Sequence, residues 1–178
     1  DQFAAAYFGG GPVIAAHVRG GDKFREDPQL QQKLAVYPQA IEHLAQGNRA
    51  TKVFLLTDAT QVVDEYRKRY GDRLITTDCL RTSTQQGLHY MGHTDRQRLG
   101  VEVVRDVLLA TRCDKFVGVG SSNVACMIHH MKPGGWPPGS VAMLGPMMSA
   151  ETDPFLYMSL EQLVPYVGPE RVASWRQN

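Results

Sequence analysis

The feature of this sequence that most restricts its fold is the alternation of short apolar runs with longer segments of helical periodicity. Unbroken apolar runs predict strands buried on both faces, and these runs are 13–18, 52–57, 74–76, 115–119 and 141–144. Helical spacing of apolar residues predicts helices over 29–46, 60–70, 95–111 and 122–131, with two short patches near 159–164 and 169–176. We therefore predict an α/β fold of the Rossmann-like, doubly wound type, a mainly parallel sheet with helices on both faces.

Proline and glycine mark the boundaries of these segments. Pro38 interrupts the segment 29–46, so two short helices are the alternative to one. Gly71 predicts the end of the helix 60–70, and the stretch PGGWPPG (133–139) predicts a loop. Residues 78–94 are polar and show no periodicity, so we expect an irregular segment there.

Length, charge and cysteine content restrict the class of protein. The 178 residues suit a single domain over 1–178. With a formal net charge of +1 we do not expect a large basic footprint for nucleic acid, and no run reaches the ~18 apolar residues of a membrane span. Three cysteines without CxxC spacing predict reduced thiols and a cytoplasmic location, with a secretory lumen as the alternative if an anchor lies upstream. His89 and His93 lack the glutamate of HExxH, so we expect loop histidines and no metal.

Polar residues gather where the predicted strands end. In a doubly wound sheet, ligands bind beyond the carboxyl ends of the strands. The residues at these tips are His17, Arg19, Gly20, Gly21, Asp22 and Lys23, then Thr57 and Asp58, and finally Gly120, Ser121, Ser122 and Asn123. These three tips predict a binding site, provided that the sheet order brings them together.

The first tip, HVRGGDK, is suited to holding an anion. Strand alternation places His17 and Arg19 on the same side, and a guanidinium fork matches the oxygens of a phosphate. Each residue taken alone also has an ordinary structural interpretation: a buried core histidine, a surface arginine, and a turn cap for Asp22.

The turn GVGSSN is a second candidate for anion binding. Its glycines permit a tight turn, and its serines open a helix, whose unpaired N–H groups attract phosphate. The alternative is that Ser121 simply caps that helix. The turn matches neither the Walker A pattern nor GxGxxG.

Asp106 lies on an apolar stripe of the predicted helix 95–111, with Leu99, Val103, Val107 and Ala110. A carboxylate in that position is costly unless it is paired. A bidentate carboxylate suits the adjacent N1–H and amino donors of guanine. An ion pair with Arg105, Arg112 or Arg73 is the alternative.

Taken in chain order, these segments resemble the motifs of the fucosyltransferases. HVRGGDK resembles the H-x-R-x-x-D-K segment of the core α1,6-fucosyltransferases and the bacterial nodulation fucosyltransferases, and more loosely that of the protein O-fucosyltransferases. VFLLTDA (53–59) resembles a second motif, and DVLLATRCDKFVGVGSSNVACMIHHM (106–131) resembles a third. The similarity covers residues 11–145.

The resemblance implies the donor-binding half of an inverting, metal-independent GT-B glycosyltransferase that uses GDP-fucose and a glycan or protein acceptor. It implies that His17 and Asp106 contact guanine and that Thr57 and Asp58 lie near the nucleoside. Arg19 would hold the β-phosphate, and Ser121 and Ser122 would bind phosphate. Lys23 with Asp27, or with the neighbouring Glu26, would correspond to a lysine–carboxylate pair that assists the general base.

Two departures from the family pattern bear on function. Many relatives carry a second arginine where this chain has Gly20, so one phosphate contact is missing. The acceptor-side domain of a GT-B enzyme is also absent from these residues. Another GDP-sugar glycosyltransferase, and a silent nucleotide-binding module, are therefore the alternative functions.

Overall fold

The computed structural model describes residues 2–20, 30–84, 87–88, 91–92 and 95–145. In chain order, its elements are α1 (Gln2–Tyr7), β1 (Val13–His17), α2 (Leu30–Ala45), β2 (Lys52–Leu56), α3 (Thr60–Tyr70), a short 3-10 turn (Gly71–Arg73), β3 (Leu74–Ile75), α4 (Arg96–Ala110), β4 (Lys115–Val119), α5 (Asn123–Met131) and β5 (Val141–Leu144). All of these elements belong to one compact unit, Asp1–Pro146. The single-domain assignment for 1–178 stays a prediction, since residues after 145 lie outside the described part.

The described strands form one five-stranded parallel sheet in the order β3-β2-β1-β4-β5. From β1 the chain first builds one side of the sheet with β2 and β3, and then returns to build the other side with β4 and β5. The order therefore reverses between β1 and β4, where Ala16 lies opposite Val117. In α/β sheets this reversal opens a crevice beyond the strand ends.

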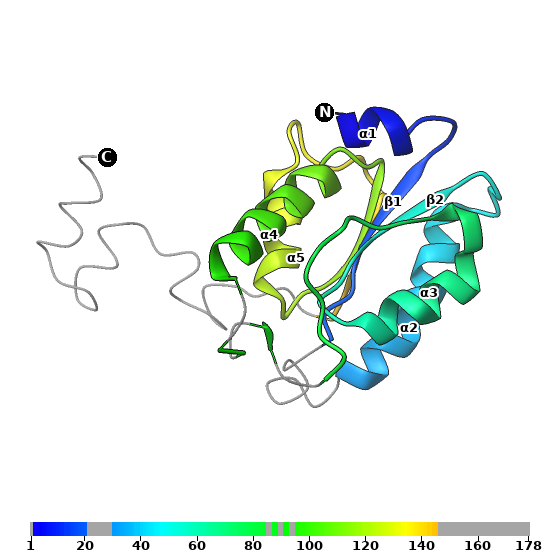
Figure 1. The fold of residues 1–178 in the computed structure, drawn as a ribbon. Helices are drawn as coiled ribbons and strands as arrows, with labels where there is room; N and C mark the ends of the chain where they lie inside the picture. The colour runs from blue at the N-terminus through cyan, green and yellow to red at the C-terminus, as the bar shows by residue number, and fades with distance from the viewer. Residues whose placement is uncertain (1, 21–29, 85–86, 89–90, 93–94, 146–178) are drawn as a thin grey trace, which may run out of the picture. The chain divides into compact units, whose positions relative to one another are not determined.

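Two helical layers cover the sheet. Alternate side chains of β1 point to opposite faces: Ile14 and Ala16, with Val18 just after the strand, join the core under α2 and α3, whereas Val13 and Ala15 join the core under α4 and α5. Figure 1 shows α2 and α3 on one side of the strands and α4 and α5 on the other. The predicted fold class is confirmed.

The sequence predicts the strands and the four longer helices within one residue of their observed ends. All five predicted strands are present, with ends that differ by at most one residue. The alternative of two helices over 29–46 is wrong, because α2 runs unbroken through Pro38. Pro38 forfeits one hydrogen bond, but Tyr37 and Ile41 on either side of it are fully buried, and that burial holds the helix together. The helix α1 was not among the predicted elements, and the patches 159–164 and 169–176 lie outside the described residues.

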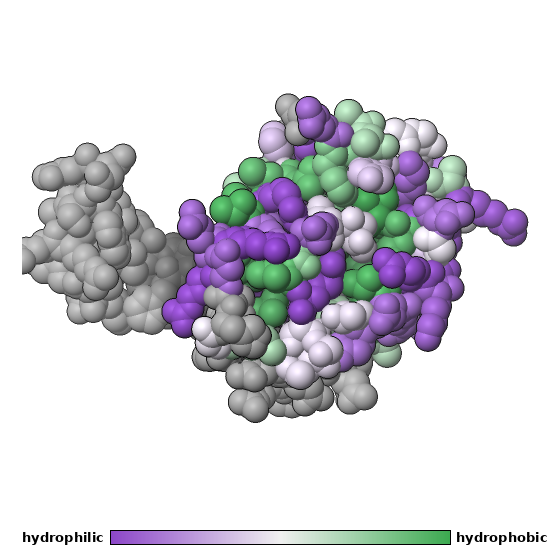
Figure 2. Space-filling view, in the orientation of Figure 1, coloured by the Kyte–Doolittle hydropathy of each residue, from purple (hydrophilic) through white to green (hydrophobic). Residues whose placement is uncertain are grey.

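The outward face of α4 is unexpectedly apolar. Val103, assigned to the buried stripe, is 39% exposed, and Val101, Val104 and Leu108 are also exposed. Figure 2 shows hydrophobic and hydrophilic patches interspersed on this face of the molecule. With apolar residues on both sides, the pattern could not fix the rotation of α4, and the buried side contains two acids, Glu102 and Asp106.

Two chain-level properties follow from the described part. None of its helices has the length and apolar character needed to cross a bilayer. Cys79, Cys113 and Cys126 are all free thiols, as predicted.

Candidate functional site

A pocket lies at the carboxyl edge of the sheet, next to the point where the strand order reverses. Its walls come from the tips of β1 and β2, the segment after β3, α4 and the first turn of α5. The cavity measures about 80 Å³, compared with roughly 300–1,000 Å³ for the sites of whole small-molecule ligands. The pocket therefore suits one part of a ligand, such as a flat base.

His17 is a deeply buried ionisable group of the pocket. The residue is only 6% exposed, and Nδ1 has no hydrogen-bond partner among the described residues. Burial, assisted by the nearby Arg19, lowers the pKa of His17 to about 3. The imidazole is therefore neutral at physiological pH, and its ring can donate or accept one hydrogen bond to a ligand. The Tyr37 hydroxyl donates to the backbone carbonyl of His17 at 2.6 Å and so fixes the backbone that carries the imidazole.

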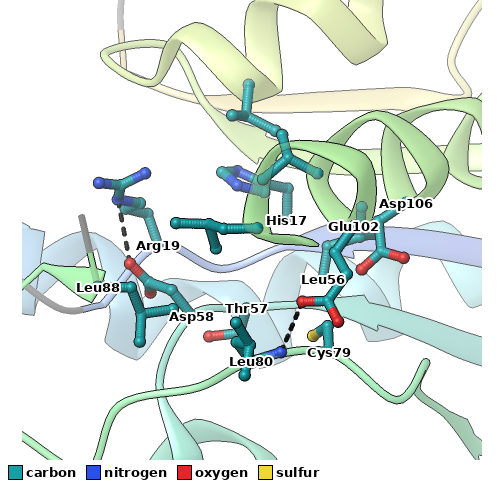
Figure 3. A pocket seen from close by; sticks show the side chains of 13 residues that line it. His17, Arg19, Leu56, Thr57, Asp58, Cys79, Leu80, Leu88, Glu102 and Asp106 are labelled. Carbon is teal, nitrogen blue, oxygen red and sulfur yellow. Dashed lines mark hydrogen bonds and ion pairs between the residues drawn. The ribbon is translucent and has the colours of Figure 1, made fainter. Parts of the chain in front are cut away.

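Arg19 and Asp58 form an ion pair at one side of the pocket. Nε of Arg19 lies 3.3 Å from Oδ2 of Asp58, and the N–H of Gly20 donates to Oδ1 at 2.9 Å. Figure 3 shows this pair apart from Glu102 and Asp106, which line the other side. Asp58 thus orients both the guanidinium and the start of the loop after β1. Contact of Asp58 and the buried Thr57 with a nucleoside stays a prediction.

The packing around Gly20 explains one departure from the fucosyltransferase pattern. A Cβ at this position would lie 2.8 Å from Cβ of Ala59, closer than real Cβ contacts allow. The second arginine expected from the resemblance would therefore collide with the turn between β2 and α3.

Asp106 is buried among donors. The Thr77 hydroxyl lies 2.9 Å from Oδ1 and 2.8 Å from Oδ2, and Nε of Arg105 donates to Oδ1 at 3.0 Å. The predicted alternative of an ion pair with Arg105 is therefore present. Burial raises the pKa of Asp106, although Thr77 and Arg105 act against that shift. A carboxylate accepts about four hydrogen bonds, so Asp106 retains capacity for a ligand.

The tip of β4 meets the tip of β1 at the same edge of the sheet. Ser122 is the N-cap of α5, so the assignment of that role to Ser121 is wrong, and the Ser122 side chain makes no capping bond. The first intrahelical bond runs from the N–H of Cys126 to the carbonyl of Ser122. The N–H groups of residues 123–125 precede it in the first turn, where backbone donors have no intrahelical partner and favour an anion. Val124, in this first turn, lines the pocket.

Sequence reasoning missed several residues of the pocket, notably Cys79, Leu80 and Glu102. Glu102 could have been found, because it lies four residues before Asp106 and so shares its helix face. Cys79 and Leu80 follow β3 in a segment without periodicity, so no sequence signal marked them.

Some predicted site residues cannot be located. Gly21, Asp22, Lys23, Glu26 and Asp27 lie outside the described residues, so the role of the lysine–carboxylate pair stays a prediction. In the part of the chain that the structure covers, no cluster of three or more His, Cys, Asp or Glu side chains could hold a metal. Metal independence likewise stays a prediction.

The fold and the pocket define a Rossmann-like α/β unit with its candidate site at the reversal of strand order. No protein-family model and no curated protein matches the chain. Among solved structures, the chain is similar to NodZ α-1,6-fucosyltransferase co-crystallized with GDP, at 22% identity and a TM-score of 0.51. It is also similar to the fucosyltransferase NodZ from Bradyrhizobium, at 21% identity and a TM-score of 0.50.

Both matches cover 72% of this chain, but only 38% and 39% of the two solved chains. The chain therefore spans less than two fifths of the length of these neighbours. At this identity the likeness concerns the fold, and at that level it confirms the resemblance predicted from the three motifs.

Proposed function

We propose that this chain is the donor-binding part of a fucosyltransferase, which binds GDP-fucose and transfers fucose with inversion to a hydroxyl group of a glycan or protein. The observation that carries this proposal is that the buried, neutral His17 and the buried Asp106 line one pocket, with Arg19 at its other side. The fold shared with a fucosyltransferase co-crystallized with GDP supports the choice of nucleotide.

In this proposal, different residues bind the base and the diphosphate of the ligand. Asp106 accepts from the N1–H and amino groups of guanine, and the neutral His17 adds one further hydrogen bond to the base. Arg19 and the first turn of α5 lie at neighbouring strand tips, where a guanidinium and free helical N–H groups favour a diphosphate. Gly20, Gly120, Ser121 and Asn123 supply the turns and backbone around it.

The transfer step follows from that placement. The acceptor hydroxyl attacks the anomeric carbon from the face opposite the diphosphate. The bond from that carbon to the β-phosphate oxygen breaks, and the configuration inverts. Arg19 stabilises the negative charge that develops on the leaving GDP. A base, which we assign to Lys23 with Asp27 or Glu26, takes the acceptor proton.

Calorimetry with GDP, UDP and ADP tests the binding proposal. We expect GDP to bind most tightly, with or without EDTA. Asp106→Asn should weaken GDP more than UDP or ADP, because it replaces an acceptor with a donor facing guanine. Equal losses for all three nucleotides would indicate general destabilisation instead.

Donor hydrolysis in a longer protein that includes an acceptor-side domain tests the sugar. Turnover of GDP-mannose but not GDP-fucose would reassign the donor. GDP binding without any turnover would indicate a silent module.

A further inference from the structure

Glu102 is a buried carboxylate on the pocket wall to which the proposed function gives no ligand role. It lies one helical turn before Asp106 on α4, and its exposed fraction is 6%. A charge at that depth is costly unless it is well paired. The partners of Glu102 therefore show what this residue holds in place.

Glu102 has one partly buried and one exposed partner. Its Oε2 accepts from the backbone N–H of Leu80 at 2.8 Å, and its Oε1 accepts from Nε of Arg98 at 2.6 Å. Burial acts to raise the pKa of Glu102, but the bonds from Leu80 and Arg98 outweigh it, so the net shift is downward. Glu102 is therefore ionised at neutral pH, and an ionised acceptor makes the stronger bond to Leu80.

Glu102 contacts the segment 77–82, which follows β3 and is fixed at both ends. At one end, Thr77 donates to Asp106. At the other end, the N–H of Thr82 donates to the carbonyl of Asp58 at 2.8 Å. Between these ends, Cys79 and Leu80 form part of the pocket wall.

The bond from Leu80 to Glu102 attaches the middle of this segment to α4. Figure 3 shows this bond beside the Cys79 side chain. His17 and Leu56, which also line the pocket, are paired at the ends of β1 and β2, and Thr57 follows directly, so these residues cannot easily shift. The width of the pocket therefore depends on the segment that Glu102 holds.

We propose that Glu102 is a positioning residue that sets the width of the base pocket and so favours a purine nucleotide over a pyrimidine nucleotide. This inference rests on the nucleotide-binding function proposed above. A purine reaches further across the pocket than a pyrimidine does, so it loses more contact when the wall moves.

Three substitutions separate the two bonds of Glu102. Glu102→Ala removes both bonds, Glu102→Gln keeps an uncharged acceptor for Leu80, and Arg98→Ala removes only the exposed partner. We expect Glu102→Ala to weaken GDP binding roughly tenfold, the usual effect of leaving the N–H of Leu80, in the pocket wall, without its charged acceptor. UDP binding, and GDP binding to Arg98→Ala, should change by less than about threefold, as for an exposed ion pair.

The GDP affinity of Glu102→Gln should lie between those of Glu102→Ala and Arg98→Ala. Equal losses for GDP and UDP in Glu102→Ala would overturn the selectivity role. Equal GDP losses in Glu102→Ala and Arg98→Ala would show that the ion pair, and not the bond to Leu80, is responsible.

A measurement without nucleotide tests the positioning role independently of the function. Cys79 lies beside Leu80 in the pocket wall, whereas Cys113 and Cys126 are buried and serve as internal references. Release of the segment should make iodoacetamide label Cys79 several-fold faster in Glu102→Ala, and not in Arg98→Ala. An unchanged Cys79 rate in folded Glu102→Ala would overturn the proposal, even if GDP binds.

A failure of GDP to bind wild-type protein would refute the proposed function, while the Cys79 rates would still report on Glu102. Should Glu102→Ala not fold, Glu102→Asp shortens the carboxylate reach by one methylene. It should shift both readouts in the same direction, and unchanged readouts there would count against the proposal.

Discussion

At the scale of single residues, the ion pair of Arg19 with Asp58 predicts that Asp58 affects nucleotide binding through Arg19. Asp58→Ala removes the ion pair with the guanidinium and the acceptor of the Gly20 N–H, so the proposed phosphate-binding geometry is lost. We expect GDP binding to weaken by about 1 kcal/mol, in the range of one hydrogen bond. GMP lacks the β-phosphate that Arg19 is proposed to hold, so its binding should change little.

Calorimetry with both nucleotides checks this prediction, and Asp64→Ala, an exposed acid on α3, is the control for net charge. A loss that is equal for GDP and GMP would instead place Asp58 at the nucleoside, as the resemblance implies.

The residues of the site divide into those that strand ends reveal and those that depend on the fold. His17, Arg19, Thr57, Asp58 and Asp106 were predicted as site residues, and all of them line one pocket. Strand tips in a parallel sheet share an edge, so apolar runs followed by polar residues were sufficient to identify four of them. The wall formed by Cys79 and Leu80 was not predictable, because its path is set by hydrogen bonds to distant residues.

At the scale of elements, the contact between β4 and α5 depends on a glycine. A Cβ at Gly118 would lie 2.7 Å from Cζ of Phe116 and 2.9 Å from Cβ of Ala125. Gly118→Ala should therefore destabilise the protein by about 1–3 kcal/mol, the usual cost of overpacking a core. Urea unfolding measures this change.

Gly100 is the matched control, because it lies exposed within α4 and a Cβ there would meet no atom within 4 Å. Gly100→Ala should stabilise the protein by about 0.5–1 kcal/mol, as alanine does within helices. A neutral Gly118→Ala would show that α5 can move away from the sheet, and with it the turn that holds Ser122.

Elements and their buried faces were predictable where the apolar pattern has a single interpretation. The strands β1, β2 and β4 are buried throughout or nearly so, and unbroken apolar runs identified them. α4 is apolar on both sides, so its buried face could be assigned only from the structure. At Pro38 the sequence misled in a different way. Proline predicts a break in a helix, but the burial of neighbouring side chains keeps α2 continuous.

At the scale of the whole molecule, the burial of His17 links folding to pH. Its pKa of about 3 in the folded protein lies below the ordinary value of 6.5 in the unfolded chain. The unfolded state therefore binds the extra proton first as pH falls. Stability from this group is complete above pH 6.5 and is lost progressively as pH falls from 6.5 toward 3. The raised pKa of Asp106 acts with the opposite sign, so it does not add to this loss.

Between pH 6.5 and pH 5, the loss for one such group approaches 1.4 kcal/mol per unit and comes to about 1.6 kcal/mol in all. Urea unfolding at the two pH values should show this decrease in wild-type protein, and His17→Asn should remove most of it. His129→Asn is the control, because burial also lowers the pKa of His129, which lies at the end of α5 away from the pocket. If His17→Asn kept the full acid dependence and His129→Asn lost it, the unfolding energy would be linked to α5, and the buried, neutral state of His17 would have to be abandoned.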